Sequence, residues 1–140
     1  MATAWALSPA QAKAPLVLHA VLETAASLSF GLQPEKQLPG ANEDTRAVLR
    51  SYSGALLSTN LLCVVFVWRA GFDDTARLVA ACLAVYHIFP ILRAVAKIQR
   101  GIGLKKGEKA RVLGGPQIHM IVHSLCFSGL VLAALLGGET

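Results

Sequence analysis

Long apolar stretches alternate with short polar segments along the whole chain. The apolar stretches cover roughly residues 14–32, 47–68, 75–96 and 116–136. Each is about 20 residues long, which as an α-helix matches a bilayer core of about 30 Å. The segments between them, QPEKQLPGANEDTR, AGFDD and KIQRGIGLKKGEKAR, carry turn-forming and charged residues. The pattern predicts a single all-α domain over residues 1–140, a bundle of four transmembrane helices.

Individual residues indicate where these helices begin and end. Pro15 suits the first turn of the first helix, where a missing N–H does no harm. Gly31 and Pro34 are expected to stop that helix. Asp73 or Asp74 is expected to cap the N-terminus of the third helix, because its carboxylate can accept a hydrogen bond from a free backbone N–H.

The composition supports a membrane protein over a soluble bundle. Hydrophobic residues make up 54% of the chain and charged residues 15%, against roughly 25% charged residues in a typical globular domain. The mean hydropathy is +0.54. A soluble four-helix bundle needs a polar outer face on every helix, and the runs LLCVVFVW and LVLAALL have none. The lipid bilayer is therefore the expected surrounding of the helices.

The net charge of +5 is interpreted as a topology signal. A nucleic-acid partner is not expected, because the basic residues lack an aromatic platform for bases. Basic residues gather instead in the first and third loops: Lys36, Arg46, Lys97, Arg100, Lys105, Lys106, Lys109 and Arg111. The opposite side holds Lys13, Arg69 and Arg77. The basic loops are therefore predicted to be cytoplasmic, with both termini lumenal or extracellular.

The endoplasmic reticulum or another endomembrane is the expected location of the protein. A second copy of the chain remains a candidate partner, since nothing in the sequence decides the oligomeric state.

Ionisable side chains occur inside all four predicted spans. Such groups are costly in a bilayer, so they usually face the bundle interior and mark function. With a rise of 1.5 Å per residue, Glu23 lies roughly 14 Å into its span, near the midplane. The same count brings Tyr86, His87 and His123 near the midplane, and Arg50, Arg93 and His119 into the cytoplasmic half. Because successive spans run in opposite directions, these side chains are predicted to form two adjacent polar levels in the bilayer. One level lies near the midplane and the other in the cytoplasmic half.

Each of these side chains also has a purely structural interpretation. Glu23 can be a counter-ion for Arg50 or for a histidine that holds the bundle together. Arg50 and Arg93 can extend to the cytoplasmic interface, and Asn60 can form a hydrogen bond between helices. His19, four residues before Glu23, can lie near the lumenal interface without a role.

A metal or haem site is the main chemical alternative. HMIVH places His119 and His123 on one helical face, the spacing of helical zinc sites, but it lacks the glutamate of the zincin motif. His87 and His123 could hold a haem, although nothing else in the sequence favours one. The cysteines lack metal-ligand spacing and are expected to be buried small hydrophobes; they are Cys63, Cys82 and Cys126. We therefore expect no metal and no cofactor.

The predicted polar levels suit proton chemistry on a lipophilic substrate. The expected catalytic residues are Glu23, His87, His123 and Tyr86, because carboxylate and imidazole groups exchange protons and a phenol donates a hydrogen bond to oxygen. The expected substrate-binding residues are Arg50, Arg93, Asn60 and His119, with guanidinium groups stabilising a developing oxyanion. Epoxide hydrolysis, double-bond isomerisation or cyclisation without a cofactor would fit this set. The alternative is a non-catalytic membrane protein, a small transport, assembly or lipid-binding subunit.

Three segments, RSYSGALLSTN, YHIFPILRA and LGGPQIHMIVH, resemble the spans of small four-helix membrane proteins from filamentous fungi. Some proteins of that kind are encoded in polyketide or terpenoid biosynthetic clusters, and the type that the chain resembles is the small membrane epoxide hydrolase of polyene pathways. The resemblance covers most of the chain. It implies an enzyme of secondary metabolism and assigns no role to any residue.

Overall fold

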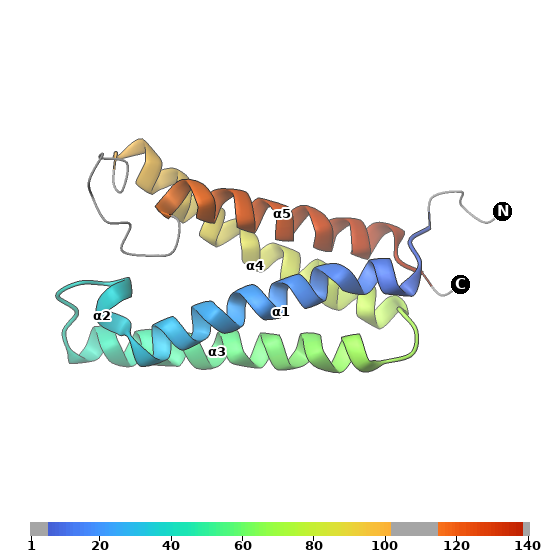
Figure 1. Cartoon of the computed structure of the whole chain (residues 1–140), viewed down its shortest axis with the longest axis horizontal. Helices are drawn as coiled ribbons and strands as arrows, with labels where there is room; N and C mark the ends of the chain where they lie inside the picture. Colours follow the sequence, from blue (N-terminus) through green and yellow to red (C-terminus); the bar gives the residue numbers. More distant parts are fainter. Residues whose placement is uncertain (1–5, 102–114, 139–140) are drawn as a thin grey trace.

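The computed structural model describes residues 6–101 and 115–138, and helices account for nearly all of them. The helices are α1 (Pro9–Leu32), α2 (Pro34–Gln37), α3 (Glu43–Trp68), α4 (Asp74–Gln99) and α5 (Gly115–Leu136), as Figure 1 shows. The described residues form no strand, only an isolated bridge between Leu7 and Gly137. The predicted all-α fold with four long apolar helices is thus confirmed.

The four long helices are arranged as two pairs. Helix α1 packs along α3, and α4 packs along α5, while contacts between α1 and α5 join the pairs. The pairs lie close together at the end where the chain begins and finishes, and they diverge toward the end that carries α2 (Figure 1). At the closed end the N–H of Leu7 donates to the carbonyl of Leu136 at 2.8 Å. The beginning of α1 and the end of α5 therefore lie on one side of the bundle.

Helix α1 begins earlier than its proline suggested. Ser8 is the N-cap, and its hydroxyl accepts a hydrogen bond from the N–H of Gln11 while the Gln11 side chain accepts from the N–H of Ser8. This reciprocal capping box satisfies two free donors at once, with Pro9 as the first helical residue. The expectation that Pro15 lies in the first turn was wrong, because Pro15 sits inside the helix.

Asparagine and aspartate caps start the next two long helices. The side chain of Asn42 accepts from the N–H of Thr45 at 2.9 Å, several residues before the predicted start of the second span. Asp73 accepts from the N–H of Ala76 at 2.9 Å, so the first of the two proposed caps for α4 is confirmed. This hydrogen bond, helped by the neighbouring Arg69 guanidinium, holds the pKa of the Asp73 carboxyl below its usual range.

The outer surface of the bundle is apolar on every long helix. Large hydrophobic side chains there are about half exposed or more, among them Val21, Leu61, Phe89 and Leu125. Such a surface is stable against lipid tails and not against water, because a soluble monomer rarely exposes large contiguous apolar patches. All four long helices are also long and apolar enough to cross a bilayer. The chain is an integral, multi-pass membrane protein.

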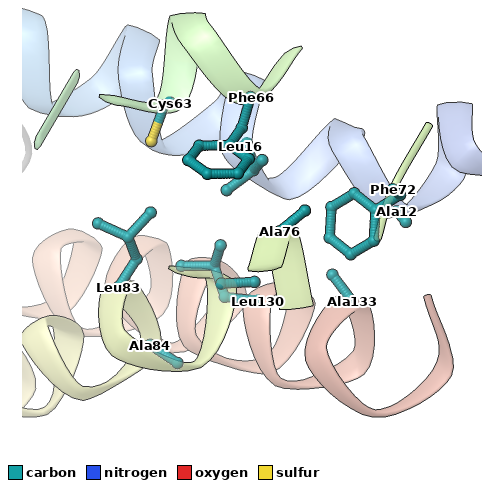
Figure 2. Packing of buried hydrophobic residues seen from close by; sticks show 11 residues of the cluster. Ala12, Leu16, Cys63, Phe66, Phe72, Ala76, Leu83, Ala84, Leu130 and Ala133 are labelled. Carbon is teal, nitrogen blue, oxygen red and sulfur yellow. The ribbon is translucent and has the colours of Figure 1, made fainter. Parts of the chain in front are cut away.

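An apolar core fills the closed end of the bundle (Figure 2). Leu16 and Leu130 are fully buried there, and the ring of Phe72 fills the space between small residues of the neighbouring helices. Small residues let helix backbones approach closely, which favours packing in a bilayer. We call this set the apolar core; its members are Ala12, Leu16, Cys63, Phe66, Phe72, Ala76, Ala80, Leu83, Ala84, Leu130 and Ala133.

The cysteine prediction was right for two of three positions. Cys63 and Cys126 are buried, but Cys82 is exposed on the outer surface of α4. The error has a physical reason: in a membrane span the lipid-facing and core-facing sides are both apolar, so hydrophobicity does not separate them.

The structure does not describe the whole of the predicted third loop. Four of the basic residues on which the predicted orientation depends, Lys105, Lys106, Lys109 and Arg111, lie outside the described residues.

Candidate functional site

Five polar side chains meet inside the bundle, next to the apolar core. We call them the polar cluster: His19, Glu23, Tyr86, His87 and His123. His19 and His87 are fully buried, Glu23 is 2% exposed and His123 is 8% exposed. The structure therefore brings together all four residues that the sequence predicted to be catalytic, although their catalytic roles remain a prediction.

Helical periodicity explains why these residues face inward. On α1 the buried positions include Leu16, His19, Glu23 and Ser27, separated by three or four residues, so they form one face of the helix. His123 holds the corresponding position on α5, three residues before the buried Cys126. The polar side chains thus continue the stripes that form the apolar core, and they are buried because their helix faces are.

The carboxylate of Glu23 is held by one partner on each oxygen. The hydroxyl of Tyr86 donates to its Oε2 at 2.9 Å. Its Oε1 lies 3.5 Å from Nδ1 of His123. The hydroxyl of Tyr52 is 3.1 Å from that of Tyr86, and it must donate, because Tyr86 uses its own proton on Glu23. A buried carboxylate is expensive unless it is paired and hydrogen-bonded, and here both oxygens are in contact with polar groups.

Three imidazole rings follow one another through the bundle. Nδ1 of His19 is 2.9 Å from Nε2 of His87, and Nδ1 of His87 is 2.9 Å from Nδ1 of His123. At the far end, Nε2 of His19 is 3.5 Å from the hydroxyl of Thr59 on α3. Together with Thr59 and Tyr52 of α3, the polar cluster therefore forms a connected chain of proton donors and acceptors that includes all four long helices.

The two predicted arginines differ in their positions. Arg50 is exposed and forms no hydrogen bond or ion pair within the described part of the chain. The structure does not bring it to the polar cluster, which agrees with extension of its side chain to the interface. Arg93 is also exposed, but it lies seven residues after Tyr86 on α4, so the two residues share a face of that helix.

Asn60 is engaged between α1 and α3. With its amide oxygen toward Thr24, it accepts from the Thr24 N–H at 3.0 Å and from the Thr24 hydroxyl at 3.1 Å, and its nitrogen donates to the carbonyl of Leu56 at 3.3 Å. These bonds use both ends of the amide, and none goes to the polar cluster. The predicted substrate-binding role of Asn60 is thus less well supported than the hydrogen bond between helices.

His119 lies beside the polar cluster and is only partly buried. Its ring stacks on that of His123, with centroids 6.0 Å apart and an angle of 26°. Its Nε2 is buried and has no hydrogen-bond partner among the described residues. The substrate-binding role of His119 stays a prediction.

Sequence reasoning missed three residues that take part in the hydrogen bonds in and around the polar cluster. His19 was considered near the lumenal interface, but it is fully buried against His87. Its spacing of four residues from Glu23 was the signal that could have placed it. Tyr52 and Thr59 were not singled out, because a single tyrosine or threonine in an apolar helix has no distinctive pattern. Only the packing of α3 against the other helices reveals their partners.

The structure also decides between the metal-binding arrangements that were considered. A haem iron between His87 and His123 does not fit, because the two ring nitrogens are already 2.9 Å apart and leave no room for a porphyrin plane. His119 and His123 stack side by side and do not converge on one point. However, Glu23, His87 and His123 each offer a ligand atom, and these atoms lie within 4.8 Å of one another.

A cavity of about 430 Å³ lies at the closed end of the bundle. None of the residues that line it belongs to the polar cluster; they are Phe72, Asp73, Asp74, Thr75, Arg77 and Gly138. This cavity is separate from the candidate site.

Comparison with known proteins adds no family to this picture. No protein-family model matches the chain, and searches of curated proteins and of solved structures find no match. The function must therefore be argued from the polar cluster itself.

Proposed function

We propose that this protein is a membrane-embedded enzyme that performs acid–base chemistry on a lipophilic substrate. One observation carries the proposal: the carboxylate of Glu23 is 2% exposed inside a bundle with an apolar outer surface, and it contacts both a phenol and an imidazole. Ionisable groups in this position are rare in membrane proteins and usually functional. A carboxylate next to imidazoles is suited to accepting a proton and passing it on.

The proposed roles follow from the contacts. Glu23 is the general acid or base, since its Oε1 has only the longer contact of 3.5 Å to His123. Tyr86 orients the carboxylate through Oε2. His123 and His87 exchange protons with it, because their nitrogens are 2.9 Å apart. Arg93 and His119, beside the polar cluster, are the candidates for binding a polar group of the substrate.

The surroundings support a lipophilic substrate. The helices present apolar side chains to the bilayer, so a substrate dissolved in lipid can reach the bundle from the side. The two helix pairs diverge toward the end that carries α2 (Figure 1). Epoxide hydrolysis, isomerisation or cyclisation of a secondary metabolite would use the proton chemistry proposed here, and the resemblance to fungal cluster proteins favours that substrate class.

A deletion followed by reconstitution tests the proposal. Removal of the gene should cause a lipophilic metabolite to accumulate, and the purified full chain in detergent should convert that metabolite. The decisive variant is Glu23→Gln, which keeps the shape of the side chain and removes its ionisable group. If Glu23 is the acid or base, turnover per folded molecule should fall roughly a hundredfold to ten-thousandfold.

Ser27→Ala provides the matched control. Ser27 is buried one turn further along the same face of α1 and hydrogen-bonds the carbonyl of Ser53. Its loss should lower thermal stability slightly and leave turnover per folded molecule unchanged. Near-normal turnover of Glu23→Gln, measured beside thermal stability on the same preparation, would rule out the catalytic assignment.

The second candidate is a non-catalytic membrane protein, such as a transport, assembly or lipid-binding subunit. It is favoured by the fact that members of the polar cluster satisfy one another, as Glu23 and Tyr86 do. A structural cluster predicts that Glu23→Gln lowers the stability of the bundle, because one polar group loses its partner. Accumulation of no metabolite after deletion, together with such a loss of stability, would favour this candidate over the enzyme.

We also propose that the protein resides in the endoplasmic reticulum or another endomembrane, with the loops before α3 and before α5 in the cytoplasm. The basic residues of the first loop support this orientation; Arg46 forms ion pairs there with Glu35 and Glu43. Cysteine labelling of the loop before α5 tests it. Labelling from the lumenal side alone would overturn the orientation and leave the proposed chemistry untouched.

A further inference from the structure

Three ligand groups converge from three different helices. Glu23 comes from α1, His87 from α4 and His123 from α5, and all three are buried. Nδ1 of His87 and Nδ1 of His123 are 2.9 Å apart, and Oε1 of Glu23 is 3.5 Å from Nδ1 of His123. A tetrahedral ion with bonds of 2.0–2.1 Å holds neighbouring ligand atoms about 3.3 Å apart. The observed separations lie on either side of that value.

The hydrogen bonds around His19 favour one tautomer of His87. The hydroxyl of Thr59 donates to the carbonyl of Leu56 at 2.8 Å, so it can only accept from Nε2–H of His19. With every ring neutral, Nδ1 of His19 then accepts from Nε2–H of His87. Neutral histidine carries one ring proton, which leaves Nδ1 of His87 with a lone pair. That lone pair faces His123.

This assignment leaves too few protons for the three facing atoms. Nδ1 of His123 contacts both Nδ1 of His87 and Oε1 of Glu23, and the ligand atoms of the three residues lie within 4.8 Å of one another. With neutral rings and an ionised carboxylate, at most one proton, that of His123, is shared among the three. One cation bonded to all three atoms satisfies them at the same time. It also compensates the buried negative charge of Glu23, which is otherwise costly.

The remaining atoms of the ligand groups already have partners of the kind that metal sites use. A histidine bound to a metal usually donates its other ring N–H to an acceptor, and a bound carboxylate is itself hydrogen-bonded. Here Nε2 of His87 contacts His19, and Oε2 of Glu23 accepts from Tyr86. These contacts fix the rings and the carboxylate whose ligand atoms lie within 4.8 Å of one another.

We propose that Glu23, His87 and His123 bind one divalent transition-metal ion of the zinc or iron(II) class. Two histidines and one carboxylate form the ligand set of catalytic zinc sites with an open position and of non-haem iron(II) sites. An ion with an open position can polarise a substrate oxygen; Glu23, His87 and His123 would then act as ligands, and the ion would replace proton transfer by Glu23 in the enzyme proposed above. The binding of the ion does not depend on that chemistry.

Metal analysis of the purified protein tests the site without any substrate. The full chain is purified in detergent, its affinity tag is removed, and it is treated with chelator. It is then loaded with Zn²⁺, with Fe²⁺ under anaerobic conditions, or with Co²⁺ as a spectroscopic probe. We expect about one ion per chain, a visible Co²⁺ absorption that Zn²⁺ displaces, and a higher melting temperature with metal. A folded wild-type chain that retains none of these ions would overturn the proposal.

Variants locate the ion. Glu23→Gln and His87→Asn should lose it, whereas His119→Asn, on α5 one turn from His123, should keep it. His19→Asn and Tyr86→Phe alter only the outer partners and should weaken binding about 10-fold to 100-fold. Unchanged affinity in both Glu23→Gln and His87→Asn would show that the ion binds elsewhere and would overturn the assignment.

A cysteine replacement keeps the test decisive if the ligand variants fail to fold. His123→Cys retains a metal ligand at the same place and should add a strong thiolate-to-metal absorption to the Co²⁺ spectrum. Bound Co²⁺ without that absorption would remove His123 from the site. Turnover without metal binding would leave the proposed enzyme and exclude the metal. Metal binding without turnover would support the metal site and count against the proposed enzyme.

Discussion

Leu16 and His19 are neighbours on the buried face of α1, but they face different kinds of partner. Leu16 is fully buried in the apolar core, where it lies beside the ring of Phe66 (Figure 2). His19 is equally buried, but it contacts the nitrogen of His87 and the hydroxyl of Thr59. One stripe of one helix thus changes from packing to hydrogen bonding within a single turn.

The two regions respond to different requirements. The apolar core needs volume to be filled, and any side chain of similar size and shape can do that. The polar cluster needs every donor to meet an acceptor, since a buried polar group without a partner costs free energy. In a bilayer the apolar core gains little from leaving water, because lipid is apolar too. Packing and polar satisfaction therefore decide how these helices associate.

The largest stability effect is expected in the apolar core. Leu16→Ala removes a fully buried side chain and leaves a cavity, and the lost packing contacts should lower the free energy of unfolding by roughly 3 kcal/mol. Thermal and denaturant unfolding in detergent measures it. Turnover and metal content per folded molecule should remain normal. A loss of metal from folded Leu16→Ala would show that the apolar core and the polar cluster are not independent.

A smaller loss of stability is expected when His19, the polar neighbour of Leu16 on α1, is replaced. His19→Leu fills the same space but leaves Nε2 of His87 without its partner. An unsatisfied buried donor should cost about 1–3 kcal/mol, less than Leu16→Ala. Unlike Leu16→Ala, this variant should also weaken metal binding, because His87 loses its orientation. Full stability together with full metal affinity in His19→Leu would mean that His19 is only a space-filling residue.

Two tyrosine variants test whether the effect on turnover decreases with distance from Glu23 along the chain of hydrogen bonds. Tyr86→Phe removes the hydrogen bond to Glu23 and should reduce turnover roughly tenfold, about 1.4 kcal/mol in the barrier. Tyr52→Phe removes a group one step further away, and it should change turnover less than that. Product formation per folded molecule compares the two variants. An effect of Tyr52→Phe that equals that of Tyr86→Phe would contradict the assigned order.

The arginine variants should show the smallest effects. Arg50→Lys should leave turnover unchanged, because Arg50 is exposed and has no ionic partner among the described residues. Arg93→Lys should raise KM if the guanidinium binds a substrate oxygen, since lysine lacks the planar pair of donors. Steady-state kinetics on matched preparations measures both. A marked loss of activity in Arg50→Lys would show that Arg50 contributes to the site.

Much of this molecule could be predicted from the pattern of its residues. Four apolar stretches of membrane-spanning length predict four helices, because a chain in lipid must satisfy its backbone internally. Rise per residue predicted that Glu23, Tyr86, His87 and His123 lie at one depth, and they meet there. The cap at Asp73 followed from its position before an apolar stretch. These results depend on local geometry, which neighbouring residues determine.

Only the tertiary structure decided which polar groups are partners. The depth of a residue along its span did not show that His19 belongs to the polar cluster and that Arg50 does not. That difference depends on how each helix is rotated and on which helices pair. Rotation also placed Cys82 on the lipid side, where an apolar residue is as stable as in the core. Ligand atoms of Glu23, His87 and His123, from three helices, lie within 4.8 Å of one another. Contacts between residues distant in sequence follow from packing, and no local pattern specifies them.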